Sequence, residues 1–502
     1  MSLSILRRRG GLLTCAILVA SAAACGSTVQ STNGVGAQSG TSLDGGSQPG
    51  QSGAVAAPGG STSAPGLPGN TTNVTAPTSP AEVPGATAAP TASGSTSVTA
   101  PSTPTTGPIR IGFLNTDIPT KQAADLGVDT GQTYAPKDWF NALVSIENKH
   151  GGINGRQIVP VIADVKPLAN SWQAEYERAC AAFTQDNKVA AVVGYTFVTE
   201  DSFLDCLTKA RTPEVAIAAF EPDATELSKA PYYFGMGPSK NRALANLLNA
   251  PFKAGYLTAK NKIGIVTGSC PNEVRSMKST WDPLIKKLGL NEAARQTISC
   301  PDGLAEGSTT VQQIQAAVLK FRSAGVDRVY TASGALLFFS QTAENQGYHP
   351  GYVLDSNTSG GQVEAQQIPK AQLRNMKGYG WVPLTDVGPP RQLKRTPAAQ
   401  HCLDLYKSAG LVPTRFNDFS NAIGTCDTYF LYKRSVEIGG STDAARVQAA
   451  LEGLGSSYAS AWTYESRFTL GVGRHDGARR YKPWAFFDDC SCFKYTGGLG
   501  DF

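Results

Sequence analysis

The most informative stretch starts with the apolar segment IRIGFLN (109–115) and ends with a second apolar segment, QIVPVIAD (157–164). The glycine-rich run HGGINGR (150–156) directly precedes the second segment. In the intervening segment 139–149, apolar residues recur at spacings of three and four, which predicts a helix with one buried face. Gly151 can take the left-handed conformation that ends a helix, and Gly155 can turn the chain into the next strand. This order of strand, helix, turn and strand predicts a parallel sheet with ligand sites at the carboxyl ends of its strands.

The glycine-rich turn also carries a family resemblance. ENKHGGINGR (147–156) resembles the N-x-x-G-G-I-N-G-R/K turn of the type I periplasmic binding proteins, which include branched-chain amino acid, amide and urea receptors of ABC importers. The resemblance implies an α/β fold of two doubly wound parallel-sheet lobes, joined by a three-segment hinge, with a ligand cleft between them. A generic strand–helix–strand turn of another doubly wound protein is the alternative that the motif alone leaves open.

The N-terminus has the order of features found in an export signal. Arginines at 7–9 precede the apolar run 12–19 and the small residues 21–24, and Cys25 follows directly. This arrangement resembles a bacterial lipobox, in which Cys25 is lipidated, although Ala22 stands where that pattern usually has Leu. Ordinary signal-peptide cleavage is therefore the alternative. The apolar run is shorter than the roughly 20 residues that span a bilayer, so we expect a lipid anchor and no membrane-spanning helix.

Residues 26–107 have the composition of a disordered tether. They are mostly Gly, Ser, Thr, Pro and Ala, they include no aromatic residue, and Asp44 and Glu82 are their only charges. Such a chain cannot bury enough apolar surface to offset the entropy lost on ordering. As a flexible coil it would span about 50 Å root mean square, which suits a tether that lifts a folded domain off a membrane.

The remaining chain, 108–502, is long enough for two lobes, and strand-like and helix-like segments alternate along it. The resemblance places three crossings between the lobes near residues 232–236, 352–355 and 462–468. The expected parts are a signal peptide (1–24), the tether (25–107), the first lobe (108–235 and 356–461), the main part of the second lobe (236–355), and a hinge return with a C-terminal hairpin (462–502).

Cysteine usage agrees with export. Of the ten cysteines, Cys15 is lost with the signal and Cys25 carries lipid, which leaves an even number in the folded part. An even number in an exported domain predicts disulfides, and their pairing stays open. No Cys-x-x-Cys pair or nearby pair of histidines is present, so we expect neither a metal site nor a cofactor. The disulfide candidates are Cys180, Cys206, Cys270, Cys300, Cys402, Cys426, Cys490 and Cys492.

Candidate ligand-binding residues follow the predicted strands, because ligands of open α/β sheets lie beyond the carboxyl ends. In family members that bind amino acids, the loops after the third and fourth strands hold the ligand carboxylate, and Thr196, Thr199, Ala219 and Glu221 match those loops. Phe220 is a candidate because its ring could stack on a ligand, and Asn272, Ser333 and Asn357 are candidates because they follow later predicted strands. The candidates are Thr196, Thr199, Ala219, Phe220, Glu221, Asn272, Ser333 and Asn357. Helix capping by the threonines, and a solvated loop position for Glu221, are the structural alternatives.

Two candidates depart from the family pattern. Glu221 stands near the position of a Ser or Thr hydroxyl, and its carboxylate would repel an anionic group. Asn357 is neutral where the family has the acidic residue that holds an amino group. These departures argue against an α-amino acid ligand and make Glu221 suited to a cationic or hydroxyl-rich one.

No catalytic motif supports an enzyme. The chain lacks a Gly-x-Ser-x-Gly elbow, a Walker loop and a His-Glu-x-x-His helix, and its four histidines have no matching acid and nucleophile nearby in sequence. Its formal net charge of +5 is small, and no clustered basic face indicates a nucleic-acid partner. A catalytic or cell-wall protein on a similar fold is the weakest of the alternatives.

The function that the resemblance implies is therefore a solute receptor on the outer face of a bacterial cell membrane. It would be anchored by lipid on Cys25, would bind a small polar ligand that is amino-acid-like or amide-like, and would deliver it to the permease subunits of an ABC importer. The alternative is a sensor of the same fold that signals to a membrane protein.

Overall fold

A computed structural model describes most of the chain after residue 106. The described residues are 107–117, 131–166, 169–196, 201–218, 221–300, 302–303, 307–331, 335–365, 368–388 and 393–502. They belong to one compact unit. The expected signal peptide, Cys25 and almost all of the expected tether lie outside the described residues. No helix in the described ranges is both long enough and apolar enough to cross a membrane.

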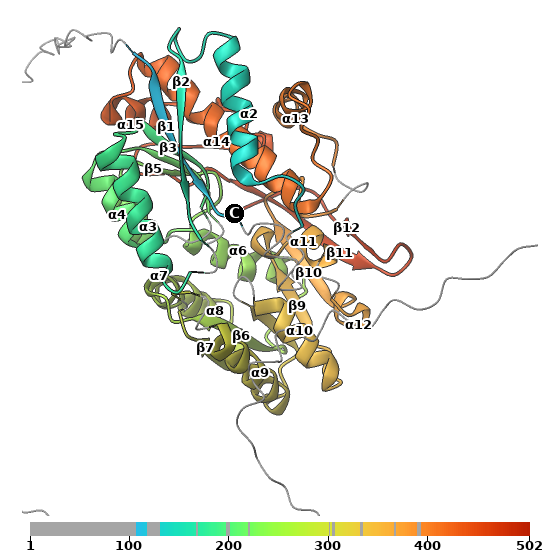
Figure 1. Cartoon of the computed structure of the whole chain (residues 1–502). Helices are drawn as coiled ribbons and strands as arrows, with labels where there is room; N and C mark the ends of the chain where they lie inside the picture. Colours follow the sequence, from blue (N-terminus) through green and yellow to red (C-terminus); the bar gives the residue numbers. More distant parts are fainter. Residues whose placement is uncertain are drawn as a thin grey trace, which may run out of the picture. The chain divides into compact units, whose positions relative to one another are not determined.

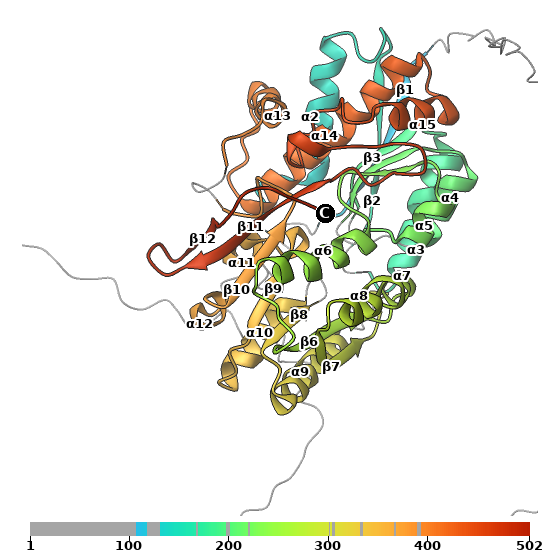
Figure 2. The same cartoon turned by 180° about the vertical axis from the view of Figure 1, so that it is seen from behind.

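The first lobe is built on a five-stranded parallel sheet with the strand order β2-β1-β3-β4-β5. Helices cover both faces, and Figures 1 and 2 show α2 and α14 on one face and α3 and α4 on the other. The strands are β1 (Ile109–Asn115), β2 (Ile158–Asp164), β3 (Ala191–Thr196), β4 (Glu214–Ala218) and β5 (Tyr233–Gly235). The helices are α2 (Pro136–Lys149), α3 (Trp172–Ala181), α4 (Asp201–Lys209), α5 (Ala224–Lys229), α13 (Pro397–Ser408), α14 (Phe416–Gly439) and α15 (Ala444–Gly453), with a π-turn η1 (Ala182–Asp186) and a short η5 (Glu465–Arg467).

The glycine-rich turn forms as its sequence predicts. Gly151, Gly152 and Gly155 all have positive φ angles, and a Cβ on Gly152 would collide with the carbonyl oxygen of Arg156. The side chain of Asn148, in the last turn of α2, accepts a hydrogen bond from the Ile158 amide at 2.7 Å and donates one to the Ile158 carbonyl at 2.9 Å. The helix end is thereby bonded to the start of β2, which fixes the register of β2 beside β1.

The second lobe is built on an eight-stranded sheet with the order β12-β11-β10-β9-β8-β6-β7, and β13 pairs with β11. Its central strands are parallel, whereas β11 runs antiparallel to its neighbours. The strands are β6 (Lys262–Gly268), β7 (Asn291–Ile298), β8 (Arg328–Thr331), β9 (Gly351–Leu354), β10 (Met376–Gly380), β11 (Arg480–Phe487), β12 (Cys492–Tyr495) and β13 (Gly500–Asp501). The helical elements are α6 (Lys240–Lys253), α7 (Pro271–Ser276), η2 (Met277–Trp281), α8 (Asp282–Lys287), α9 (Gly307–Ala324), α10 (Ala335–Asn345), η4 (Ser356–Thr358), α11 (Gly360–Ala365) and α12 (Lys370–Leu373).

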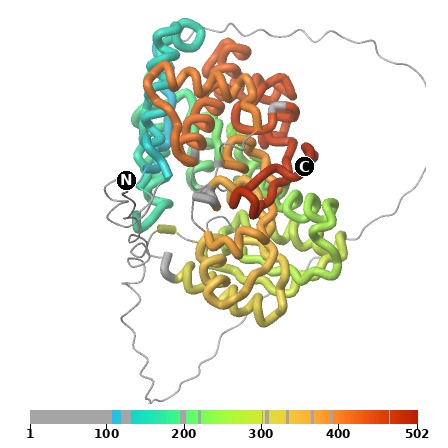
Figure 3. The backbone as a smooth tube through the Cα atoms, turned by 90° about the vertical axis from the view of Figure 1, so that its right-hand side faces the viewer, coloured from blue at the N-terminus to red at the C-terminus, as the bar shows by residue number. Residues whose placement is uncertain are grey.

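Two lobes with largely parallel sheets confirm the predicted fold class. Separate apolar cores lie on the two faces of the second sheet, one beneath α9 and α10 and the other beneath α6 and α8. Figure 3 shows that the yellow-green and yellow middle of the chain lies in the second lobe, while the blue beginning and much of the orange part lie in the first. The chain therefore passes between the lobes three times.

The second passage lies later in the chain than expected. Residues 352–355 were expected to cross between the lobes, but β9 lies in the middle of the second sheet, between β8 and β10. The chain leaves that sheet only after Gly380, because Trp381 and Val382 already pack in the core of the first lobe. The main part of the second lobe thus extends beyond residue 355. An all-apolar run suits both a buried strand and a crossing strand, so the sequence could not separate the two.

The third passage is also later than residues 462–468, since Phe468 and Ala478 still belong to the first core and β11 begins at Arg480. It runs beside the first passage. The Gly235 amide donates a hydrogen bond to the His475 carbonyl at 2.7 Å, and the Ser239 amide donates one to the Asp476 carboxylate at 2.9 Å. These two passages therefore form a hydrogen-bonded pair at the hinge.

The eight late cysteines form four disulfides in the structure. The pairs are Cys180–Cys206, Cys270–Cys300, Cys402–Cys426 and Cys490–Cys492. The first pair joins α3 to α4 on one face of the first sheet, and the third joins α13 to α14 on the other. On the chain-entropy argument, each of the three bridges that close 24 to 30 residues stabilises the fold by about 3 kcal/mol.

Candidate ligand-binding site

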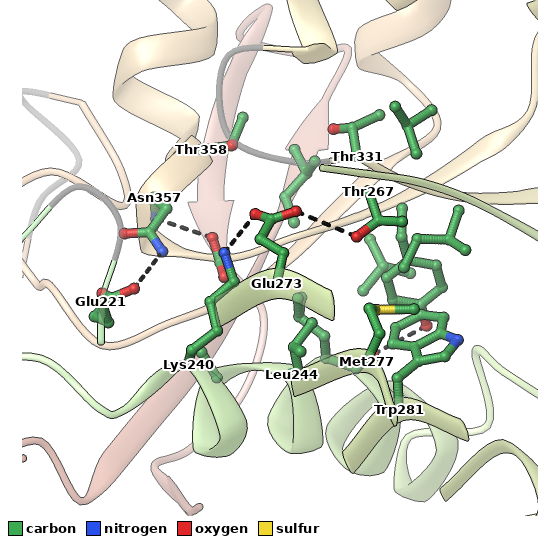
Figure 4. A pocket seen from close by; sticks show the side chains of 18 residues that line it. Glu221, Lys240, Leu244, Thr267, Glu273, Met277, Trp281, Thr331, Asn357 and Thr358 are labelled. Carbon is green, nitrogen blue, oxygen red and sulfur yellow. Dashed lines mark hydrogen bonds and ion pairs between the residues drawn. The ribbon is translucent and has the colours of Figure 1, made fainter. Parts of the chain in front are cut away.

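A cavity of about 70 Å³ lies at the carboxyl ends of β6, β8 and β9. Its polar wall combines residues of the second lobe with Glu221, which follows β4 of the first lobe (Figure 4). Its apolar wall includes Leu244 on α6, and Met277 and Trp281 on η2. A space of this size holds a few water molecules, so a larger ligand requires the polar side chains in it to move.

A buried ion pair forms the centre of the polar wall. Lys240, the first residue of α6, lies with its Nζ 2.6 Å from Oε1 of Glu273 on α7. Glu273 also accepts hydrogen bonds from the Gly268 amide and from the Thr267 hydroxyl, the latter at 3.2 Å. Burial acts to raise the pKa of Glu273, but the Lys240 ammonium and these hydrogen bonds outweigh burial and hold the pKa below its ordinary value. Burial acts to lower the pKa of Lys240, but the Glu273 carboxylate outweighs burial and raises it.

Glu221 lies in the same cavity without such a partner. Its side chain is almost completely buried, and it accepts one hydrogen bond, of 3.0 Å, from the side-chain amide of Asn357. Burial raises the pKa of Glu221 to about 8, and the charge of nearby Asp355 adds to the rise. At neutral pH the Glu221 carboxyl is therefore largely protonated, and it can donate as well as accept a hydrogen bond.

Asp355, directly after β9, is the third carboxyl in the cavity. It begins the short turn η4 and accepts a hydrogen bond from the Asn357 amide at 2.9 Å. Burial raises the pKa of Asp355 to about 6, although the backbone amides of Asn357 and Thr358 and the charge of Lys240 oppose this rise. Asn357 thus donates hydrogen bonds to two carboxyl groups, those of Asp355 and Glu221, and Figure 4 shows the bond to Glu221.

Ion pairs and hydrogen bonds also join the lobes at the rim of this site. Arg275 on α7 lies 2.6 Å from the Asp223 carboxylate and 2.7 Å from the Glu226 carboxylate, both at the start of α5 in the first lobe. On another part of the rim, Asp302 accepts hydrogen bonds from the Ser171 hydroxyl and the Gln173 amide, each at 2.9 Å. The Cys270–Cys300 disulfide joins the start of α7, the helix that carries Arg275, to the segment that precedes Asp302. The structure therefore has its lobes in contact.

The structure brings together two of the residues expected from the sequence, because Glu221 and Asn357 are hydrogen-bonded across the lobes. Asn272 is buried at the start of α7, but it is the adjacent Glu273 that lines the cavity. Thr196 ends β3, and its side chain is not among those described. Thr199, Ala219, Phe220 and Ser333 lie outside the described residues.

Sequence reasoning did not select Lys240 or Glu273. Lys240 opens α6, the helix that follows the first passage, and its place shortly after the expected crossing at 232–236 could have drawn attention to it. Glu273 has the sequence context of an ordinary acidic residue in a first helical turn, so no signal identified it as buried. Among the described residues, no group of three or more His, Cys, Asp or Glu side chains is arranged to hold a metal ion.

Comparison with known proteins places this architecture in a family. The family described as "Periplasmic binding protein" matches residues 108–477. No curated protein matches the chain. A possible leucine/isoleucine/valine-binding protein from Rhodopirellula baltica is similar in structure, with a TM-score of 0.58 and 13% identity over 78% of this chain and 96% of that one.

Two further solved structures are similar at the same level. A branched-chain amino acid ABC transporter protein from Thermus thermophilus, with bound valine, has a TM-score of 0.58 and 14% identity over 78% of this chain and 97% of that one. A solute-binding protein of an ABC transporter from Rhodopseudomonas palustris, in complex with 3,4-dihydroxybenzoic acid, has a TM-score of 0.55 and 13% identity over 78% and 97%. At such identities the likeness shows the fold and leaves the ligand to the residues of the site.

Proposed function

Because this chain belongs to the periplasmic binding protein family, with the type I fold, we propose that it is a solute receptor that feeds an ABC importer. It captures a small polar ligand, amino-acid-like or amide-like, in the cavity between Glu221 and the second lobe, and it delivers this ligand to the permease subunits. One observation carries the proposal: the cavity at the strand ends of the second lobe is completed by a side chain of the first lobe.

A ligand in this position contacts both lobes. Only such a ligand can shift the population toward the closed arrangement, since a shift requires a difference in contact between the open and closed states. The Glu221–Asn357 hydrogen bond already links the lobes at the cavity, and Arg275 links them at the rim. Ligand groups that replace or extend the Glu221–Asn357 bond would stabilise closure further.

The similar structures support a role in transport and leave the ligand open. Those proteins include one with bound valine and one in complex with 3,4-dihydroxybenzoic acid, so chains of this fold accept ligands of different chemistry. Their descriptions name ABC transporters in both cases. Transport of a small polar solute is therefore the function that the family favours, and the polar side chains of the cavity agree with a polar ligand.

A ligand screen tests the receptor function. The full chain is tested by thermal shift against amino acids, amides, polyamines and sugars, and we expect at least one solute to raise the melting temperature in a concentration-dependent way. Small-angle scattering with that solute should then show a smaller radius of gyration, because contacts from both lobes close the hinge. A panel without any stabilising solute, or closure without dependence on concentration, would contradict the proposal.

We further propose that the receptor is extracytoplasmic and anchored to the outer face of the cell membrane by lipid on Cys25. The order of basic, apolar and small residues before Cys25 supports this anchor. Metabolic labelling with palmitate should label the wild-type chain and leave Cys25→Ala unlabelled. Equal labelling of both chains, or labelling of neither, would contradict lipid anchoring and leave the receptor function untouched.

A further inference from the structure

The polar wall of the cavity carries an excess of acidic groups. Among the described residues that line it, Glu221, Glu273 and Asp355 contribute three carboxyl groups, and Lys240 contributes the one cation. That ammonium lies 2.6 Å from Glu273. Within the described part of the chain, no basic side chain lies at salt-bridge distance from Glu221 or Asp355. The wall therefore has two buried carboxyl groups that no cation of the described residues contacts.

These two groups face one another around a single neutral residue. The side-chain amide of Asn357 donates to Glu221 at 3.0 Å, and its backbone amide donates to Asp355 at 2.9 Å. Glu221 comes from the loop after β4 in the first lobe, and Asp355 comes from the end of β9 in the second. Hydrogen bonds from a neutral amide are weaker than those from a cation. A cationic group of a ligand would therefore bind these two carboxyl groups more strongly than Asn357 does.

The protonation of Glu221 agrees with this reading. Burial raises the pKa of Glu221 to about 8, and the charge of Asp355 adds to this rise, whereas the hydrogen bond from Asn357 and the charge of Lys240 oppose it. Glu273 is the partner of that lysine, and Tyr233 of β5 lies near enough for the Glu221 charge to raise its pKa. A cation placed beside Glu221 would favour its charged form and release the proton that it carries at neutral pH.

The other end of the cavity is apolar. Leu244, Met277 and Trp281 lie beyond the Lys240–Glu273 pair, on the side away from Glu221 (Figure 4). Trp281 is fully buried and packs edge-on against Tyr330 at 4.8 Å between ring centres. A short hydrocarbon chain or ring fits a surface of this kind better than a second charged group does.

We propose that the ligand is a small amine: its ammonium or guanidinium group lies between Glu221 and Asp355, and its hydrocarbon part lies against Leu244, Met277 and Trp281. This inference rests on the proposed receptor function, because it names the ligand class of the same cavity. The described wall offers no second cation for a carboxylate, since Lys240 is held by Glu273. An amine without a carboxylate therefore matches the charge of the wall better than a zwitterionic amino acid does.

Titration calorimetry of the full chain at pH 7.5 tests the ligand class with matched probes. Pentylamine and agmatine are the cations, leucine is the zwitterion, pentanoate is the anion and pentanol is the neutral analogue. We expect the cations to bind and pentanoate not to bind. In buffers of different ionisation enthalpy, binding of a cation should release protons, because Glu221 loses its proton on contact.

Two buried glutamates provide the matched variants. Glu221→Gln should weaken binding of the cations at least tenfold and abolish the proton release. Glu214→Gln should change neither, since Glu214 is also buried and has a pKa raised to about 8 but lies at the opposite end of β4 and does not line the cavity. The probe selectivity of the wild-type chain decides the question even if a variant folds poorly.

The outcomes separate this inference from the receptor function. If leucine or pentanoate binds and the cations do not, the amine class is overturned and the receptor function stands. If the cations bind equally well to wild type and Glu221→Gln, the position of the cationic group is overturned. If no probe binds to the wild-type chain, the amine class is contradicted, and the wider thermal-shift screen then decides the receptor function by itself.

Discussion

Glu221 and Glu273 line the same cavity, and their exposed fractions are similar, at 5% and 7%. Their pKa values nevertheless shift in opposite directions. The pKa of Glu221 rises to about 8, whereas that of Glu273 falls below its ordinary value. The difference is the partner, because Glu273 has an ammonium at 2.6 Å and Glu221 has an amide at 3.0 Å. Burial alone therefore does not decide the charge of a cleft carboxyl; the nearest cation does, and an unmatched carboxyl is where a ligand can supply one.

The largest expected effect comes from removing Lys240, the cation that distinguishes Glu273 from Glu221. Lys240→Met leaves Glu273 buried without its partner and should destabilise the chain by about 3 to 5 kcal/mol, the usual loss for half of a buried pair. Urea unfolding at pH 7 measures it. The double variant Lys240→Met with Glu273→Gln should recover most of the loss, because no charge then remains unpaired. A single variant as stable as wild type would show that the pair does not determine the state of Glu273.

Titration of Glu221 gives the next largest effect. The folded chain keeps the Glu221 proton up to about pH 8, whereas the unfolded chain releases it near the ordinary value of 4.5. The contribution of Glu221 to stability is therefore fully present below pH 4.5, and it is lost as the pH rises from about 4.5 to about 8. Glu221→Gln lacks this loss, so its stability relative to wild type should increase across that window by about 2 to 4 kcal/mol and then level off.

Unfolding of both proteins at a series of pH values measures the difference. Glu214→Gln serves as the parallel variant, since Glu214 has a similarly raised pKa and should show a similar window without lining the cavity. Parallel stability curves for wild type and Glu221→Gln would mean that Glu221 is already ionised in the folded chain, which would remove the contrast with Glu273.

The ion pairs of Arg275 at the rim extend the comparison to a cation that is partly exposed to water. The Arg275 side chain is 34% exposed and meets Asp223 and Glu226, which also cap one another at the start of α5. Asp223 and Glu226 are themselves buried, but their capping bonds remain when the partly exposed guanidinium is removed, so Arg275→Gln should cost about 1 to 3 kcal/mol, less than Lys240→Met. Urea unfolding in low salt and in 1 M NaCl tests this, and the loss should shrink in high salt. A loss as large as that of Lys240→Met would mean that exposure does not weaken the rim pair.

The sequence predicted most of what depends on local order. HGGINGR predicted a helix end and a turn, and the positive φ angles of its glycines agree with that reading. The apolar strands and the two-lobe architecture followed from alternation and from the family resemblance, which the match over residues 108–477 confirms. The crossings at 352–355 and 462–468 were wrong, because an apolar segment satisfies a central strand and a crossing strand equally well.

In the cavity, the sequence alone identified Glu221 and Asn357, since both directly follow strands and strand ends converge. Only the tertiary structure decided that Lys240 meets Glu273 and not Glu221 or Asp355. That choice depends on where the start of α6 lies relative to α7, a packing of helices that no spacing in the chain records. It also fixes which carboxyl is charged, because a pKa responds to burial and to the nearest charge, and both are properties of the folded surroundings rather than of the residue.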